Sequence, residues 1–318
     1  MSVPEQSHDR LSLPLIAAPM FLVSGPDLVI EACKSGVIGA LPTANCRTVE
    51  QLDEWFTQIY QQLHTFASSH PDLRVAPPCA NLIVHRSNRR LTEDLELVRK
   101  HRIEVVIASV GSPHAIIEPI HDYGGLVFAD VASMRHVEKA MAAGTDGLIL
   151  LTAGAGGQTG WANPLAFVRQ VREMFDGPLV LAGGVADGIA LYAAEVLGSD
   201  LAYMGTRFIA TQESMAAEGY KRMIIDSGLD DIKLTRAFTG LETNMIRQSI
   251  EEAGLDPDNL AERDMIDVSK DLDPANQDKR RYRDIWSAGH TAGSVHDVPT
   301  VHDLVDRLKQ EYEKARDA

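Results

Sequence analysis

The chain has 318 residues, 45% of them hydrophobic, which is enough to bury a core in one large α/β barrel or in two ordinary domains. It carries 30 Lys and Arg against 45 Asp and Glu, and the resulting net charge of −15 disfavours binding to nucleic acid or to anionic membranes. No stretch approaches the length of a membrane span, and the polar start MSVPEQSHDR has no apolar signal core.

Cysteine usage indicates a reducing compartment. Cys33, Cys46 and Cys79 are odd in number and show no CxxC spacing, so neither a disulfide framework nor a zinc site is expected. Each is predicted to be a small buried hydrophobic residue. We therefore expect a cytoplasmic protein with no bound metal.

Short, continuous apolar runs recur along the first two thirds of the chain, as expected for strands that are buried on both faces. They span residues 15–19, 37–41, 75–84, 105–110, 126–129, 148–151, 179–182 and 201–204. A helical pattern follows each run. Eight such units between residues 15 and 210 predict a (β/α)₈ TIM barrel. The alternative, an open doubly wound sheet, would need a GxGxxG turn after its first strand, where the chain reads FLVSGPD.

Start and stop signals mark the helices between these runs. Thr48 and Gln51 form a candidate capping box ahead of an apolar stripe over residues 52–66. Asn163 and Pro164 place an N-cap and a first-turn proline at the start of a later helix. Three glycines lie where helices should end: Gly36, Gly144 and Gly198.

After residue 210 the alternation stops. We expect a barrel over residues 1–212, a small helical insertion or lid over 213–290, and a C-terminal helix over 291–318. Residues 251–284 are polar and rich in charge. The last helix should begin at Thr300, and its apolar face should pack on the barrel or, alternatively, on a second copy in a homodimer.

The active site of a TIM barrel lies at the C-terminal ends of its strands. This rule selects Ala18, Pro19, Met20, residues 42–45, Asn81, Ser109, Asp130, residues 152–160, Gly183, Gly184, Gly205 and Thr206. Two of these places, LAGGV at 181–185 and MGTRF at 204–208, are glycine turns that open helices after the seventh and eighth strands. Glycine lets backbone N–H groups approach a phosphate closely, so the pair predicts a phosphate site. The glycine-rich segment 152–160 is suited to lie flat against a planar ligand.

These motifs carry a family resemblance. Residues 11–210 resemble the nitronate monooxygenase (2-nitropropane dioxygenase) family, which also includes FMN-dependent enoyl-ACP reductases and NADH:quinone reductases. The matching pieces are LIAAPM at 15–20, AGAGGQTG at 153–160, PLVLAGGVADG at 178–188, LAYMGTRFIAT at 201–211 and IWSAG at 285–289.

The resemblance implies a non-covalent FMN and assigns its contacts. Ala18, Pro19 and Met20 would line the isoalloxazine. Asn81 would hydrogen-bond the flavin, and Gly156 and Gly157 would approach its ring or ribityl chain. The phosphate side would be formed by Gly183, Gly184, Met204, Gly205 and Thr206.

The chain departs from the family at the residues expected to act on substrate. Gln158 stands where relatives commonly have a histidine, and a glutamine cannot accept a proton near pH 7. His290 follows Ala288 and Gly289 where relatives often have glutamine. Two interpretations stay open: His290 replaces the missing imidazole, or it is a surface histidine. We expect Asp130 to turn toward backbone or a helix N-terminus, because an anion beneath a flavin would oppose reduction.

The resemblance leaves several functions open. The first is a nitronate monooxygenase that oxidises a small alkyl nitronate with O₂ to a carbonyl compound and nitrite. Nitronates are already carbanion-like, so a base is less necessary. The second is an NAD(P)H-dependent flavin reductase or dehydrogenase acting on an enoyl or acyl thioester. The third is a flavin- or phosphate-binding barrel without turnover.

Overall fold

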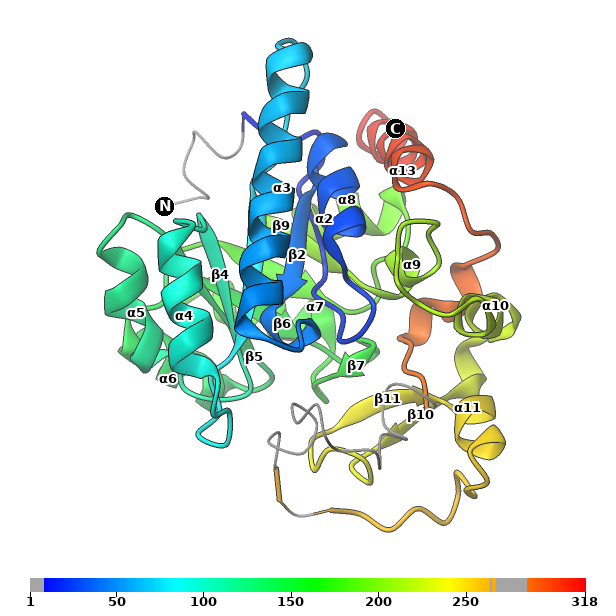
Figure 1. Cartoon of the computed structure of the whole chain (residues 1–318). Helices are drawn as coiled ribbons and strands as arrows, with labels where there is room; N and C mark the ends of the chain where they lie inside the picture. The colour runs from blue at the N-terminus through cyan, green and yellow to red at the C-terminus, as the bar shows by residue number, and fades with distance from the viewer. Residues whose placement is uncertain (1–8, 264, 267–284) are drawn as a thin grey trace.

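The computed structural model describes residues 9–263, 265–266 and 285–318. Within them, eight parallel strands close into a barrel in the order β1-β2-β3-β4-β5-β6-β8-β9 (Figure 1). The strands are β1 (Leu15–Ala17), β2 (Ile38–Pro42), β3 (Pro78–Ile83), β4 (Val105–Ser109), β5 (Leu126–Val131), β6 (Gly147–Leu151), β8 (Leu179–Ala182) and β9 (Leu201–Met204). The TIM barrel and all eight predicted strands are therefore confirmed.

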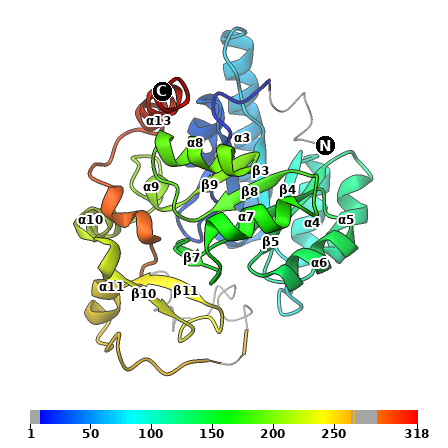
Figure 2. The same cartoon turned by 180° about the vertical axis from the view of Figure 1, so that it is seen from behind.

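A helix follows each barrel strand, and the longer helices cover the outer face of the barrel (Figures 1 and 2). These helices are α2 (Pro26–Lys34), α3 (Val49–Ser69), α4 (Leu91–Lys100), α5 (His114–His121), α6 (Met134–Ala143), α7 (Pro164–Arg172), α8 (Gly188–Leu197) and the single turn α9 (Thr206–Ile209). The predicted caps are present: the side chain of Thr48 accepts from Gln51 N, and that of Asn163 accepts from Leu165 N. Gly144 and Gly198 end α6 and α8 in the left-handed conformation.

The barrel interior is packed with branched and aromatic side chains rather than forming a channel. Ile16, Ile107, Phe128, Ile149 and Val180 belong to this cluster, and each is at most 1% exposed. The three cysteines are buried and unbridged, as predicted. This filled interior supports the strand ends, where the cavity described below opens.

The segment after the barrel contains helices, as expected, and also an antiparallel hairpin that the sequence did not indicate. It contains α10 (Glu218–Asp226), the 3₁₀ turns η2 (Leu229–Asp231) and η3 (His290–Ser294), α11 (Arg247–Glu252), and an antiparallel hairpin of β10 (Ile232–Thr235) and β11 (Thr243–Ile246). The hairpin forms a three-stranded sheet with β7 (Gly157–Gln158), a piece of the glycine-rich loop (Figure 2). Four-residue strands give too short an alternation to be distinguished from irregular chain. Most of the charged stretch 251–284 lies outside the described residues.

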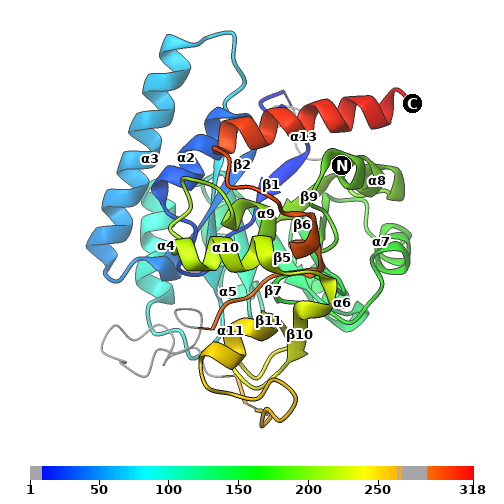
Figure 3. The ribbon, with the colours of Figure 1, turned by 90° about the vertical axis from the view of Figure 1, so that its right-hand side faces the viewer.

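The C-terminal helix α13 (Val301–Arg316) is capped by Thr300, as predicted, and lies against α8 and α2 (Figure 3). Leu304, Val305 and Leu308 are buried in this contact. Gly188 allows the close approach, because a Cβ there would lie 2.3 Å from the Leu308 carbonyl oxygen. The apolar face is thus covered within the chain, and a homodimer stays a prediction.

None of the helices in the described ranges is both long and apolar enough to cross a membrane.

Candidate active site

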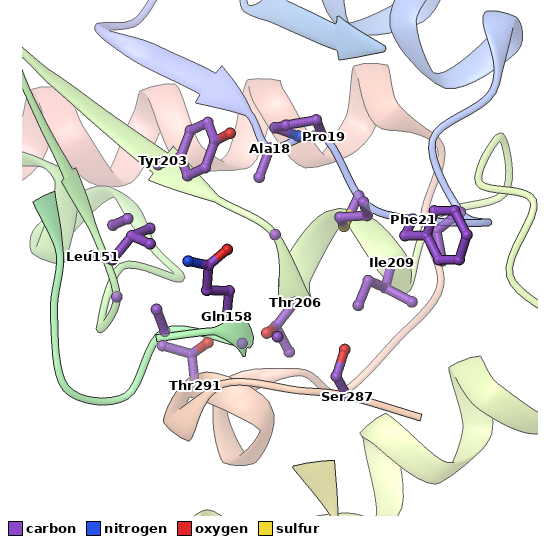
Figure 4. Close-up of a pocket in the computed structure, with 18 of the residues that line it drawn as sticks. Ala18, Pro19, Phe21, Leu151, Gln158, Tyr203, Thr206, Ile209, Ser287 and Thr291 are labelled. Atoms are coloured by element: carbon purple, nitrogen blue, oxygen red, sulfur yellow. The ribbon is translucent and has the colours of Figure 1, made fainter. Parts of the chain in front are cut away.

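A cavity opens at the C-terminal ends of the barrel strands, and we call it the cofactor cavity (Figure 4). Most residues that the sequence selects contribute to its wall: Ala18, Pro19, Met20, Asn81, Gly156, Gly157, Gln158, Gly183, Gly184, Gly205 and Thr206. Met204 does not line it but is buried directly below, where its carbonyl oxygen accepts a hydrogen bond from Ala18 N at 3.0 Å. The fold therefore gathers five sequence motifs around one space.

Two glycine turns form one end of this cavity. Gly183 and Gly184 have φ angles of 113° and 80°, which favour glycine. A Cβ on Gly183 would lie 2.7 Å from Thr152 Oγ1, so that position is closed to larger residues. A Cβ on Gly184 would meet nothing within 4 Å. The turn after β8 thus leaves an open concavity bounded by backbone, of the kind that accepts a phosphate.

The glycine-rich loop is held in place from two sides. Asn244 on β11 donates from Nδ2 to Ala155 O at 2.8 Å, and His290 N donates to Gly154 O at 2.9 Å. A Cβ on Gly156 would lie 2.7 Å from Gly289 N, so the loop packs directly on the 285–289 segment. The buried Thr206 hydroxyl accepts from the same Gly289 N at 2.9 Å. These contacts join the motifs at 153–160, 204–208 and 285–289.

The loop after β1 is held by the side chain of Asn45, a role that the sequence did not indicate. Asn45 accepts from Leu22 N at 2.8 Å and donates to Ser24 O at 2.7 Å and Met20 O at 3.0 Å. Leu22 has a φ of 60°, which is costly for a leucine and is maintained by this network. Asn45 lies in the 42–45 strand end, so its position was predicted, but its role depends on a contact 23 residues away.

The wall beneath the loops is polar. Asn81 donates from Nδ2 to Ser109 Oγ at 3.0 Å, and both side chains line the cavity with Asp130 and Tyr203. Within the described chain, Asp130 Oδ1 is buried without a hydrogen-bond partner. The expectation that Asp130 turns toward backbone or a helix N-terminus was therefore wrong, because its strand register directs it into the cavity. Burial raises the pKa of Asp130 to about 7.

His290 is not among the residues that line the cofactor cavity. Its side chain is exposed, and its Nδ1 lies 2.8 Å from the position of a Cβ built on Gly154, on the outer side of the loop. Ser287 and Thr291 from the same segment line the cavity instead (Figure 4). The structure thus does not bring His290 together with Gln158, and the surface interpretation fits its position.

Tyr220 and Ser287 also belong to the cavity wall, and no sequence motif indicated Tyr220. The Tyr220 hydroxyl donates to Ser287 O at 2.5 Å, and its ring stacks on Trp286 at a centroid distance of 5.1 Å. Helix α10 is thereby attached to the 285–289 segment. The IWSAG motif could have indicated this wall, since it contains both Trp286 and Ser287.

A second cavity adjoins the first, between the barrel mouth and the β10–β11 hairpin, and we call it the hairpin cavity. Its own wall is mainly apolar and includes Pro42, Ala44, Ile83, Val110, Leu241 and Ile266. It shares Pro19, Phe21, Asn81, Ser109 and Gln158 with the cofactor cavity. Of the described residues that line it, none is charged. The shared residues therefore form a boundary at which a cofactor and an apolar substrate could meet.

A TIM barrel with a glycine-rich cavity at its strand ends and an adjoining apolar cavity has the arrangement of a barrel enzyme's active site. Comparison with known proteins specifies it further: the chain belongs to the nitronate monooxygenase family, whose model matches residues 7–311. The members of this family are oxidoreductases, and this chain is an oxidoreductase.

The chain is similar to curated enzymes of two kinds. It is 26% identical to the nitronate monooxygenase of Paraburkholderia phytofirmans, over 95% of this chain and 94% of that protein. It is also 26% identical to the (3aS,4S,5R,7aS)-5-hydroxy-7a-methyl-1-oxo-octahydro-1H-indene-4-carboxyl-CoA dehydrogenase of Rhodococcus jostii, over 76% of this chain. That match spans 65% of the dehydrogenase, just under two thirds of its length.

Solved structures agree on the fold. FabK from Thermotoga maritima superposes with a TM-score of 0.78 at 20% identity, covering 99% of this chain and 98% of that one. Nitroalkane oxidase from Streptomyces ansochromogenes gives a TM-score of 0.78 at 23% identity, covering 97% and 98%.

Proposed function

We propose that the chain is an FMN-dependent nitronate monooxygenase that oxidises small alkyl nitronates with O₂ to a carbonyl compound and nitrite. One observation carries the choice of substrate. The glycine-rich loop contributes Gln158, an amide, to the boundary between the two cavities. An amide can orient a substrate oxygen but cannot remove a proton from carbon. A nitronate has already lost that proton.

The cavity wall fits FMN. The open concavity at Gly184 suits the phosphate, which backbone N–H groups and the turn at Gly205 would bind. Ala18 and Pro19 offer an apolar edge to the ring system. Asn81 has its amide N–H₂ directed to Ser109, so its carbonyl oxygen is the group it would offer to a flavin N–H. When bound, the flavin would supply electron transfer from the nitronate to O₂.

The remaining residues would bind and orient the substrate. The alkyl part would lie in the hairpin cavity against Ile83 and Leu241, where apolar surface favours it. The Gln158 side-chain amide points into the cofactor cavity and can donate to a nitronate oxygen (Figure 4). Phe21 and the hairpin would exclude bulk water from the boundary. Each of these roles needs a neutral side chain, as is found there.

The test is anaerobic mixing of FMN-loaded protein with ethylnitronate, with neutral nitroethane and NADH as matched controls. We expect ethylnitronate to bleach the flavin absorbance. Nitroethane should react far more slowly, because Gln158 cannot deprotonate it. Bleaching by NADH with no response to ethylnitronate would overturn the proposed substrate.

A second candidate is an NAD(P)H-dependent reductase or dehydrogenase acting on an enoyl or acyl thioester. The specific observation in its favour is the hairpin cavity, whose apolar wall extends away from the cofactor cavity and can accept a longer chain. The similarity to a carboxyl-CoA dehydrogenase agrees with this. NADH-dependent bleaching followed by reoxidation with an enoyl thioester would select it.

A further inference from the structure

Asp130 is a polar residue of the cofactor cavity that lacks a hydrogen-bond partner for one of its carboxyl oxygens. It lies near the C-terminal end of β5 and lines the cavity, and in the described part of the chain its Oδ1 is buried with no hydrogen-bond partner. A buried polar atom without a hydrogen-bond partner destabilises the folded protein, and more strongly if the group is charged. Asp130 does not line the hairpin cavity. The missing hydrogen-bond partner of Asp130 is therefore expected to be a ligand in the cofactor cavity rather than a substrate in the hairpin cavity.

The groups around Asp130 indicate which form of the carboxyl a flavin would meet. The pyrimidine edge of an isoalloxazine has one N–H donor flanked by two carbonyl acceptors. Asn81 suits the donor with its carbonyl oxygen, since its amide N–H₂ points to Ser109 at 3.0 Å. A carboxylate beside the two acceptors would repel them. A carboxylic acid would donate to one of them.

We propose that Asp130 binds the flavin as a neutral carboxylic acid, and that its hydroxyl group donates a hydrogen bond to an acceptor of the isoalloxazine. This rests on the proposed FMN cofactor. FMN affinity is then linked to protonation of one carboxyl, and the affinity falls when that proton is lost.

The surroundings of Asp130 keep its neutral form favourable. Burial raises its pKa from 3.8 to about 7, and no cation contributes to the shift. The strands that pair with β5 on either side, β4 and β6, have no titratable residue. The titratable groups that interact with Asp130 across the barrel are Cys79 and Tyr203. Burial raises the pKa of each well above its ordinary value, so both are neutral near pH 7.

The experiment is titration of FMN-free protein with FMN between about pH 5.5 and 8.5, followed by flavin fluorescence. Wild type is compared with Asp130→Asn, whose amide keeps a neutral donor at every pH. Asp230→Asn is the matched control, because it removes an exposed carboxylate outside both cavities. The FMN phosphate also titrates in this range, but equally in all three proteins. The ratio of wild-type to variant dissociation constants therefore isolates Asp130.

We expect the ratio for Asp130→Asn to be flat at low pH and to rise by about tenfold per pH unit once the carboxyl of the free protein ionises. The ratio for Asp230→Asn should be flat throughout. A flat ratio for Asp130→Asn would overturn the inference, whether or not the variant binds FMN more weakly. Failure of wild type to bind FMN at every pH would overturn the cofactor proposal as well.

Discussion

The two cavities at the barrel mouth are built in different ways. The cofactor cavity is formed mainly by the ends of barrel strands and the loops that follow them, where conformations such as the positive φ angles of Gly183 and Gly184 are determined within a few residues. The hairpin cavity exists because β11 pairs with β7, which brings Thr243 to Gln158 across 85 positions of chain. Under the proposed function, the barrel would bind the cofactor and the inserted hairpin would decide which substrate fits. Changes in one region should therefore leave the other largely intact.

Gly183→Val should give the largest difference between the two cavities, by impairing FMN binding without changing the hairpin cavity. The φ of 113° and the 2.7 Å approach to Thr152 Oγ1 exclude a branched side chain from the turn. We expect FMN affinity to fall by about a hundredfold or more, from backbone strain and a displaced phosphate site. FMN titration measures this. Gly254→Val is the control, since Gly254 also has a positive φ but no neighbour within 4 Å of its Cβ position. Equal losses in both variants would show that strain alone is responsible.

Asp130→Asn tests the cofactor cavity through stability rather than binding. The folded protein holds the Asp130 proton up to about pH 7, whereas the unfolded chain releases it near 3.8. Wild type therefore loses stability relative to the variant as pH rises between those values, and the difference is constant above them. In urea unfolding of FMN-free protein, the free energy of unfolding of the variant should rise relative to that of wild type by about 2–3 kcal/mol between pH 5 and pH 8. A difference that does not change with pH would show that Asp130 does not titrate in this range.

Leu241→Trp should act on the hairpin cavity alone. A larger ring there takes the space proposed for the alkyl chain. We expect kcat/KM for a four-carbon nitronate to fall by about tenfold or more, while FMN affinity changes by less than about threefold. The exposed Leu255 supplies the control variant Leu255→Trp. A matching loss of FMN affinity in Leu241→Trp would mean that the two cavities are not independent.

Gln158 lies at the boundary, so its variants probe both regions. Gln158→Ala should lower kcat/KM for ethylnitronate by about tenfold, through loss of one hydrogen bond to a charged group. Gln158→His should add slow turnover of neutral nitroethane, with a pH–rate profile that rises through the histidine pKa. Steady-state nitrite release measures both. No gain on nitroethane would argue that Gln158 is too far from the substrate carbon.

The smallest effect is expected for His290→Ala. The side chain is exposed and lies outside both cavities. Activity and its pH profile should stay within about twofold of wild type. A loss of an ionisation from the pH profile would restore the interpretation in which His290 acts in place of the missing imidazole.

The same contrast explains what could be predicted from the sequence. The eight strands and the turns at Gly183 and Gly205 follow from local apolar runs and from glycine conformations. The hairpin did not, because β10 and β11 are each four residues long and depend on pairing with a distant loop. Nor did the side-chain directions of Asp130 and His290, which are decided by strand register and by packing on Gly154. Local rules thus located the strand ends, while the tertiary contacts decided which side chains face the cavities.

The proposed function requires that a flavin in the barrel and an ionised nitronate beside Gln158 react with O₂. This reaction can be measured as nitrite release from ethylnitronate in air, together with oxygen consumption, on FMN-free and FMN-loaded protein. We predict rapid, FMN-dependent nitrite release that needs no NADH. Oxygen consumption or flavin bleaching that requires NADH, with no nitrite formed from ethylnitronate, would contradict the proposed function.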